Sequence, residues 1–192
     1  MSKRHLAMTP TKLFGRLMEA MNAAAYREAI QGLPARGAVL EIGFGTGRFL
    51  EMLAASGSYA LIAGIDPTPA MVAMAGARPA LRQPGSQADI RLGTAESLPW
   101  GEATFDAVVA IHCFQFWSDP HAAVQEVRRV LKPGGLLRLV LRAHGAHPPD
   151  WLPNPISRAG DEDAGASALL SAAAFEAVLA GPGHRIDARK PA

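Results

Sequence analysis

Short runs of apolar residues alternate with longer segments of helical periodicity through the middle of this 192-residue chain. Apolar runs of strand length occur at 37–42, 59–65, 89–92, 105–111 and 136–141. Helices are predicted between them at 46–56, 69–77 and about 119–131. Strands that are apolar on both faces are typical of parallel sheets with helices on each side. The pattern therefore predicts an α/β fold with a doubly wound, mostly parallel sheet.

The two ends of the chain depart from this alternation. Residues 1–35 predict an N-terminal helical cap, with an amphipathic helix from about Thr9 to Ile30. Residues 143–192 predict a long polar loop at 143–166, a last helix at 167–180 and a sixth strand at 184–189. We expect the whole chain, 1–192, to form a single domain around a ligand-binding core at 36–142.

A turn rich in glycine joins the first predicted strand to the helix after it. Gly43, Gly45 and Gly47 stand at alternate positions, and Glu41 precedes them. A turn without side chains lets a ligand approach the backbone at a helix N-terminus. The dinucleotide-binding pattern needs a small residue where Arg48 stands, which disfavours a nicotinamide cofactor. A tight turn that binds no ligand remains the simpler alternative.

Asp66 strengthens the ligand hypothesis because it ends the second predicted strand, next to the glycine turn. A carboxylate at this place can accept hydrogen bonds from both hydroxyls of a ribose, each worth roughly 1.5–3 kcal/mol. The alternative is that Asp66 and Pro67 only begin the next turn.

Five motifs in succession resemble those of class I S-adenosylmethionine-dependent methyltransferases. They lie at 39–47, 64–66, 93–100, 104–109 and 129–135. Within that superfamily the chain is most similar to the small-molecule branch that includes the ubiquinone and menaquinone C-methyltransferases. The resemblance covers residues 36–142 and implies a Rossmann-like methyltransferase fold, S-adenosylmethionine as the cofactor and a small organic molecule as the methyl acceptor.

The resemblance also implies a set of cofactor-binding residues. Glu41 and the backbone of Gly43, Gly45 and Gly47 would face the methionine part, and Asp66 the ribose. The remaining residues implied are Pro67 and Met71 near the adenine, Thr94 and Ala95 at the adenine edge, and Ile111 and His112 beside the methionine part. Many family members have Asp where this chain has Thr94, so we expect Glu96 to substitute for that contact.

Methyl transfer from a sulfonium is an in-line displacement, so the protein has mainly to align the reactants. A base is needed only where the acceptor must lose a proton. His112 is the candidate by its position after the fourth predicted strand, although a packing role is the more common one for such a histidine. The absence of a recognisable catalytic group keeps a second hypothesis open, a non-catalytic cofactor-binding or regulatory module.

Aromatic residues and histidines near the predicted site add further candidates. The sequence predicts packing roles for Phe114, Phe116 and Trp117, and one of them could form a wall of a substrate pocket. Trp151 in the 143–166 loop could belong to a lid, with Phe14 and Tyr26 of the N-terminal helix covering the other side. His144 and His147 lack a third ligand at convincing spacing, so we expect no metal. Cys113 lacks an evident partner for a nucleophilic role.

Composition narrows the setting of the protein. The 19 Lys and Arg residues nearly balance 17 Asp and Glu, for a net charge of +2, and no basic stripe predicts nucleic-acid binding. A lone cysteine excludes an internal disulfide. The chain shows neither an apolar signal-peptide core nor a run of ~18 apolar residues that a membrane span needs. We therefore expect a cytoplasmic protein.

The end of the chain departs from the family pattern. Members usually finish with a sixth strand and an antiparallel seventh strand inserted beside it. This chain reaches Ala192 directly after the predicted strand at 184–189, so we expect the seventh strand to be missing. An open sheet edge must be paired or shielded, and we expect a homodimer that covers it.

Overall fold

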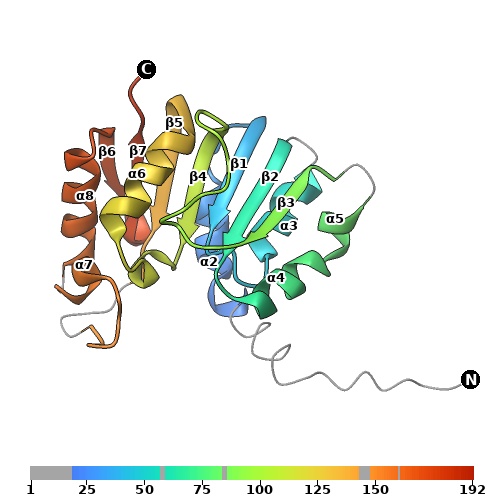
Figure 1. Cartoon of the computed structure of the whole chain (residues 1–192), viewed down its shortest axis with the longest axis horizontal. Helices are drawn as coiled ribbons and strands as arrows, with labels where there is room; N and C mark the ends of the chain where they lie inside the picture. Colours follow the sequence, from blue (N-terminus) through green and yellow to red (C-terminus); the bar gives the residue numbers. More distant parts are fainter. Residues whose placement is uncertain (1–18, 57–58, 84–85, 143–147, 160) are drawn as a thin grey trace, which may run out of the picture.

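The computed structural model describes residues 19–192 apart from 57–58, 84–85, 143–147 and 160. Seven strands form one sheet in the order β3-β2-β1-β4-β5-β7-β6 (Figure 1). The strands are Gly37–Ile42 (β1), Tyr59–Asp66 (β2), Ala88–Leu92 (β3), Phe105–Ile111 (β4), Leu131–Val140 (β5), Glu176–Gly181 (β6) and Arg185–Arg189 (β7). The first five are parallel to one another, and β7 is antiparallel to both β5 and β6. The predicted α/β class and mostly parallel sheet are confirmed.

Helices cover both faces of the sheet. The helices of the described residues are Ala23–Ile30 (α2), Arg48–Ser56 (α3), Pro69–Gly76 (α4), Pro79–Arg82 (α5), Pro120–Val130 (α6), Pro155–Arg158 (α7) and Glu162–Ala172 (α8), with short 3-10 turns at Phe114–Phe116 (η1) and Pro182–His184 (η2). One buried cluster joins the sheet to α6 and α8, and the other joins it to α2, α3 and α4. Neighbouring residues of β1 divide between them, since Leu40 packs in the first and Val39 in the second.

Two predictions about the C-terminal part are wrong. Residues 176–181, expected at the end of a helix, form β6, and the expected sixth strand is β7, which lies between β5 and β6. The seventh strand is therefore present. β6 is a largely exposed edge strand whose sequence shows no alternation of apolar and polar residues, so its pairing with β7 decides its structure.

The same correction removes the reason for expecting a homodimer. A missing seventh strand was expected to leave a sheet edge open, but β7 pairs with β5 on one side and with β6 on the other. The expected loop at 143–166 also carries structure, since α7 and the start of α8 lie within it.

The parallel strands bring distant parts of the sequence to one edge of the sheet. β1, β2, β3, β4 and β5 all end there, and the segments that follow them hold the glycine turn, Asp66, Thr94, His112 and Arg142. Ligands of doubly wound sheets bind at this edge, near the switch in strand order. Here that switch lies between β1 and β4.

Candidate functional site

A cavity of about 590 Å³ opens at the carboxyl ends of the strands. All of the predicted site residues except Gly47 line it: Glu41, Gly43, Gly45, Asp66, Pro67, Met71, Thr94, Ala95, Glu96, Ile111 and His112. Asn22 and Tyr26, at the start of α2 and within it, line the cavity as well. The N-terminal helix thus contributes to the site as expected, while Phe14 lies outside the described residues.

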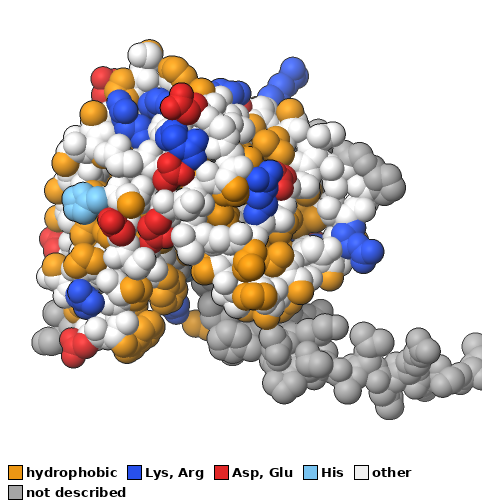
Figure 2. Space-filling model, viewed as in Figure 1, with side chains coloured by type: hydrophobic (Ala, Val, Ile, Leu, Met, Phe, Trp, Pro, Cys, Tyr) orange, Lys and Arg blue, Asp and Glu red, His pale blue; other side chains and the backbone are white. Residues whose placement is uncertain are grey.

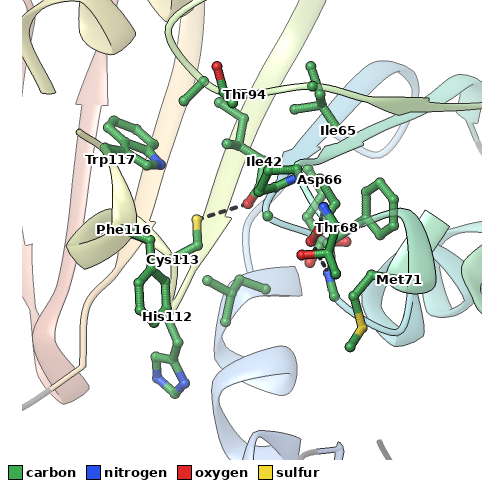
Figure 3. A pocket seen from close by; sticks show the side chains of 18 of the residues that line it. Ile42, Ile65, Asp66, Thr68, Met71, Thr94, His112, Cys113, Phe116 and Trp117 are labelled. Atoms are coloured by element: carbon green, nitrogen blue, oxygen red, sulfur yellow. Dashed lines mark hydrogen bonds between the residues drawn. The ribbon is translucent and has the colours of Figure 1, made fainter. Parts of the chain in front are cut away.

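The cavity has two sides that differ in chemistry (Figure 3). Ile65, Asp66, Thr68 and Met71 lie on one side, called the β2 side below. His112, Cys113, Phe116 and Trp117 lie on the other, called the β4 side. The glycine turn after β1 runs between them, because β1 is hydrogen-bonded to both β2 and β4.

The glycines of the turn have different structural tasks. Gly45 opens onto the cavity, and a Cβ placed on it would meet nothing within 4 Å. Gly47 is buried, and a Cβ there would lie 2.6 Å from the Cβ of Ala75 in α4. Both residues have positive φ, 53° and 76°, which favours glycine. Gly47 therefore supports the site by close packing and does not face the cavity.

The glycine amides are bonded inside the protein. The amide of Gly43 donates to the carbonyl of Ile65 at 2.8 Å, and that of Gly45 donates to Asp66 Oδ2 at 2.9 Å. Arg78, from the segment after α4, holds the turn from behind by donating to the Thr46 carbonyl at 2.6 Å. The turn is thus fixed in shape before any ligand arrives, and Arg78 is a contributor that no motif in the sequence indicated.

Asp66 combines the two roles that the sequence left as alternatives. Its Oδ2 accepts from Gly45 and its Oδ1 accepts from the amide of Thr68 at 2.9 Å, so it does begin the next turn. It is also a buried residue that lines the cavity. A carboxylate has about four acceptor positions, so these two bonds leave capacity for hydroxyl donors of a ligand.

Glu41 is a buried acid with an unsatisfied oxygen. It is 2% exposed, and its Oε2 has no hydrogen-bond partner among the described residues. Burial raises the pKa of Glu41 well above its usual value, and the nearby charge of Asp66 raises it further. A buried carboxyl group of this kind is costly to fold, and a cationic donor in the cavity would relieve that cost.

At the far end of the β2 side, Thr94, Ala95 and Glu96 follow β3. Thr94 is exposed, and Ala95 is buried. Glu96 Oε1 accepts from the Ser118 amide at 2.9 Å and from the Ser118 hydroxyl at 3.1 Å. This carboxylate therefore joins the β3 end to the segment before α6, and its role as a substitute for the family's Asp stays a prediction.

His112 has an unusual backbone and a defined polar partner. It follows β4 with φ of 51°, a conformation uncommon outside glycine and frequent at functional sites. Its Nδ1 lies 3.0 Å from Asn22 Oδ1. Because a carbonyl oxygen can only accept, this contact places the ring proton on Nδ1 and leaves Nε2 as an acceptor. Burial, and secondly the charge of Arg142, lower the pKa of His112 below its usual 6.5, so the ring is neutral at pH 7.

The aromatic residues after β4 divide between core and cavity. Phe114 is fully buried and meets Trp117 edge to face, with 5.1 Å between ring centroids. Phe116 is 51% exposed, lines the cavity, and stacks on Trp151 at 6.3 Å. The hypothesis that one of these aromatics walls the pocket thus fits Phe116 best, and Trp151 lies beside it.

Cys113 is an inert structural residue. It is buried, its thiol donates to the carbonyl of Ile42 at 3.0 Å, and burial raises its thiol pKa. A protonated thiol is a poor nucleophile. No group of three or more metal-ligating side chains occurs in the part of the chain that the structure describes, and His144 and His147 lie outside that part.

The surface charges and the helices are informative about nucleic-acid and membrane partners. In the face that Figure 2 shows, Lys and Arg side chains are interspersed with Asp and Glu, so this face has no basic stripe. Among the described helices, none combines the length and apolar character that crossing a bilayer would require.

Comparison with known families decides what kind of site this is. The model of the methyltransferase domain family matches residues 40–139, which run from within β1 to within β5 and include the glycine turn. The chain belongs to the methyltransferase domain family. A methyltransferase of Mycobacterium tuberculosis is 38% identical over 102 residues, and the malonyl-[acyl-carrier protein] O-methyltransferase of a Paenibacillus strain is 35% identical over 103 residues.

These matches cover 53% and 52% of this chain but only 38% and 36% of the two relatives. The chain thus matches well under half the length of these curated relatives. Among solved structures, an S-adenosylmethionine-dependent methyltransferase from Aquifex aeolicus covers 95% of this chain and 98% of its own, with a TM-score of 0.68 and 17% identity. That likeness shows the Rossmann-like methyltransferase fold over nearly the whole chain.

S-adenosylmethionine is the cofactor of this family, and the residues present fit it. Oε2 of Glu41 is buried without a partner among the described residues. The ammonium group of the methionine part is a cationic donor that fits this oxygen. The spare acceptor positions of Asp66 match the ribose hydroxyls. The open surface at Gly45 leaves space where a side chain would otherwise stand.

Proposed function

We propose that this chain transfers the methyl group of S-adenosylmethionine to a small organic molecule. The observation that carries the proposal is the division of one cavity into a β2 side suited to an adenosyl group and a β4 side available to a second ligand. A volume of about 590 Å³ falls within the ~300–1,000 Å³ of small-molecule sites. Asn22 and Tyr26 line the cavity from the α2 side and bound it there, which favours a small acceptor over a macromolecule.

The chemistry divides between the cofactor and the protein. When bound, S-adenosylmethionine supplies a methyl group already activated on a sulfonium. The chain holds the two reactants in line, and orientation of this kind can lower a barrier by ~7–11 kcal/mol in favourable cases. Glu41 and Asp66 hold the cofactor, and the β4 side holds the acceptor.

His112 is proposed as the group that removes a proton when the acceptor must lose one. The ring is neutral at pH 7, is oriented by Asn22, and has Nε2 free to accept. Protonation as the pH falls through the lowered pKa of His112 would remove that acceptor, so the rate should decline on the acid side. In His112→Gln we expect kcat to fall by ~10²–10⁴, with the affinity for cofactor little changed. A packing role would instead lower stability and leave the pH profile unchanged.

A transfer assay tests the function itself. Purified protein is incubated with S-adenosylmethionine labelled on its methyl group and a fractionated mixture of small metabolites. We expect label in a small organic product, and its structure gives the acceptor and the atom methylated. Label in protein or RNA would contradict the proposed acceptor class.

The alternative, a non-catalytic module, predicts a different result. Such a module would bind S-adenosylhomocysteine, the demethylated product, and transfer no label to any fraction. The seventh strand that was expected to be missing is present, and a complete sheet favours the enzyme. A relationship to the ubiquinone and menaquinone branch and a cytoplasmic location remain predictions.

A further inference from the structure

We propose that the methyl acceptor is an acid with a flat apolar body, whose anionic group binds Arg142 and whose body lies against Phe116. This inference rests on the proposed function, since it assigns the second ligand of the same cavity. The first observation is the distribution of charged side chains around the cavity. Among the residues that line the described cavity, Arg142 is the sole Lys or Arg, whereas Glu41, Asp66 and Glu96 are acids.

Asp66 and Arg142 lie three strands apart at the carboxyl edge of the sheet. Asp66 ends β2 and Arg142 follows β5, with β1 and β4 between them. At a strand spacing of about 4.8 Å, three steps across the sheet separate them by roughly 14 Å. The ammonium group of the cofactor is assigned to Glu41 and its ribose to Asp66, so Arg142 faces the part of the cavity left for the acceptor.

Arg142 is available to a ligand. It is half-buried, and no hydrogen bond or ion pair ties its guanidinium to another described residue. Other arginines of the chain are engaged, for example Arg138 with Asp187 and Arg129 with Glu126. Arg142 is close enough to His112 for its charge to act on that ring. A guanidinium that is half-buried and uncompensated suits a carboxylate, which it can bind through two parallel N–H donors.

Aromatic residues on the β4 side of the same cavity define the rest of the ligand. Phe116 lines the cavity and is 51% exposed, and Trp151, which is 70% exposed, stacks on it with 21° between the ring planes. Two large exposed rings at the rim of a cavity form an apolar surface of the kind that binds ligands. A planar acid would satisfy Arg142 and these rings together.

The test uses two probes of nearly the same shape, 2-naphthoate and the neutral 2-naphthamide. Each is titrated into the full chain saturated with S-adenosylhomocysteine, and binding is followed by ligand-observed NMR. We expect the naphthoate to bind at least tenfold more tightly. Arg142→Gln should abolish that preference, Arg142→Lys should keep part of it, and Phe116→Ala should weaken both probes alike. Equal binding of the two probes, or binding of neither, would overturn the proposal.

Arg36→Gln is the matched control, because Arg36 is exposed at the amino end of β1, away from the cavity, and its loss changes the net charge equally. It should retain the full preference. The competing assignment is that Arg142 binds the carboxylate of the cofactor. In that case Arg142→Gln would weaken S-adenosylhomocysteine but not 5′-methylthioadenosine, which lacks the carboxylate, and this result would also overturn the proposal. Failure of the wild-type chain to bind S-adenosylhomocysteine would instead refute the proposed function.

Discussion

The two sides of the cavity are built in different ways. On the β2 side, backbone groups fix the shape, since Asp66 holds the amides of Gly45 and Thr68. On the β4 side, side chains from distant segments meet, as where His112 contacts Asn22 and where Asn154 Nδ2 donates to the Phe114 carbonyl at 2.7 Å. A backbone-built surface suits a ligand common to a whole family. A surface of side chains can change with the acceptor, so the β4 side is where this chain's specificity should be sought.

The largest expected effect comes from a residue that connects the sheet to α2. Arg138 in β5 is 3% exposed, pairs with Asp187 in β7 at 2.6 Å, and donates to the carbonyls of Ala29 and Gln31 at the end of α2. Arg138→Leu leaves Asp187 with only the longer contact to Arg185 at 3.7 Å and leaves the α2 carbonyls without their donor, and we expect a loss of ~3–5 kcal/mol in the free energy of unfolding. Chemical denaturation measures it.

Arg189→Leu is the matched control for that variant. Arg189 lies in β7, is exposed, and donates to the Gly134 carbonyl at 3.0 Å. Its replacement should change the unfolding free energy by no more than about 0.5 kcal/mol. Equal losses of unfolding free energy in the two variants would contradict the role of Arg138 in connecting the sheet to α2.

The glycine turn allows a comparison within the β2 side. In Gly47→Ala the new methyl group collides with Ala75 and φ is positive, so we expect a loss of about 2–4 kcal/mol in stability. In Gly45→Ala the new methyl group meets no neighbour, so only the strained backbone conformation lowers stability, by about 1–2 kcal/mol. This methyl group stands in the cavity.

Gly45→Ala should therefore lose more affinity for S-adenosylhomocysteine relative to its loss of stability. Thermal denaturation and calorimetric titration of both variants measure the two quantities. A larger stability loss in Gly45→Ala than in Gly47→Ala would contradict the separate tasks assigned to these glycines.

Glu41 should affect stability with a characteristic dependence on pH. Its pKa is raised in the folded protein above the 4.5 of an ordinary glutamate. As pH rises from about 4.5, the unfolded chain loses this proton before the folded chain does, so Glu41 increasingly disfavours folding until its folded pKa is passed. Glu41→Gln should thus melt at a higher temperature than wild type, by a margin that grows over this range.

The same group links cofactor binding to proton release. A cationic amine next to Glu41 favours the ionised form, so cofactor binding at a pH below the raised pKa of the free protein should release a proton that Glu41→Gln does not release. Calorimetry in buffers of different ionisation enthalpy measures this. Identical proton release in both proteins would mean that Glu41 does not face the cationic part of the cofactor.

How far the sequence could predict this molecule depends on the range of the interactions. β1 and β4 were predicted with their observed bounds because apolar runs and turn residues act locally. Residues 176–181 were mistaken for a helix because only pairing with β7 makes them a strand. In the site, the glycine turn and Asp66 were found from motifs, although the packing of Gly47 against Ala75 was not.

Residues joined only by the fold could not be found in this way. Arg78 and Arg142 belong to no motif, and Asn22 meets His112 across 90 positions of sequence. Arg48 was used to argue against a dinucleotide on packing grounds, yet its side chain is 44% exposed and pairs with Glu51, away from the contact of helix and strand. The family match, not that packing argument, identifies the cofactor.

The central claim is that the β2 side binds the adenosyl part of S-adenosylmethionine through Asp66. Calorimetric titration with S-adenosylhomocysteine, compared between wild type and Asp66→Ala, tests it most directly. We expect micromolar binding to wild type, no binding of NAD, and at least tenfold weaker binding to the variant, which corresponds to ~1.4 kcal/mol. Equal affinity in the folded variant, or binding of NAD in place of S-adenosylhomocysteine, would contradict the claim.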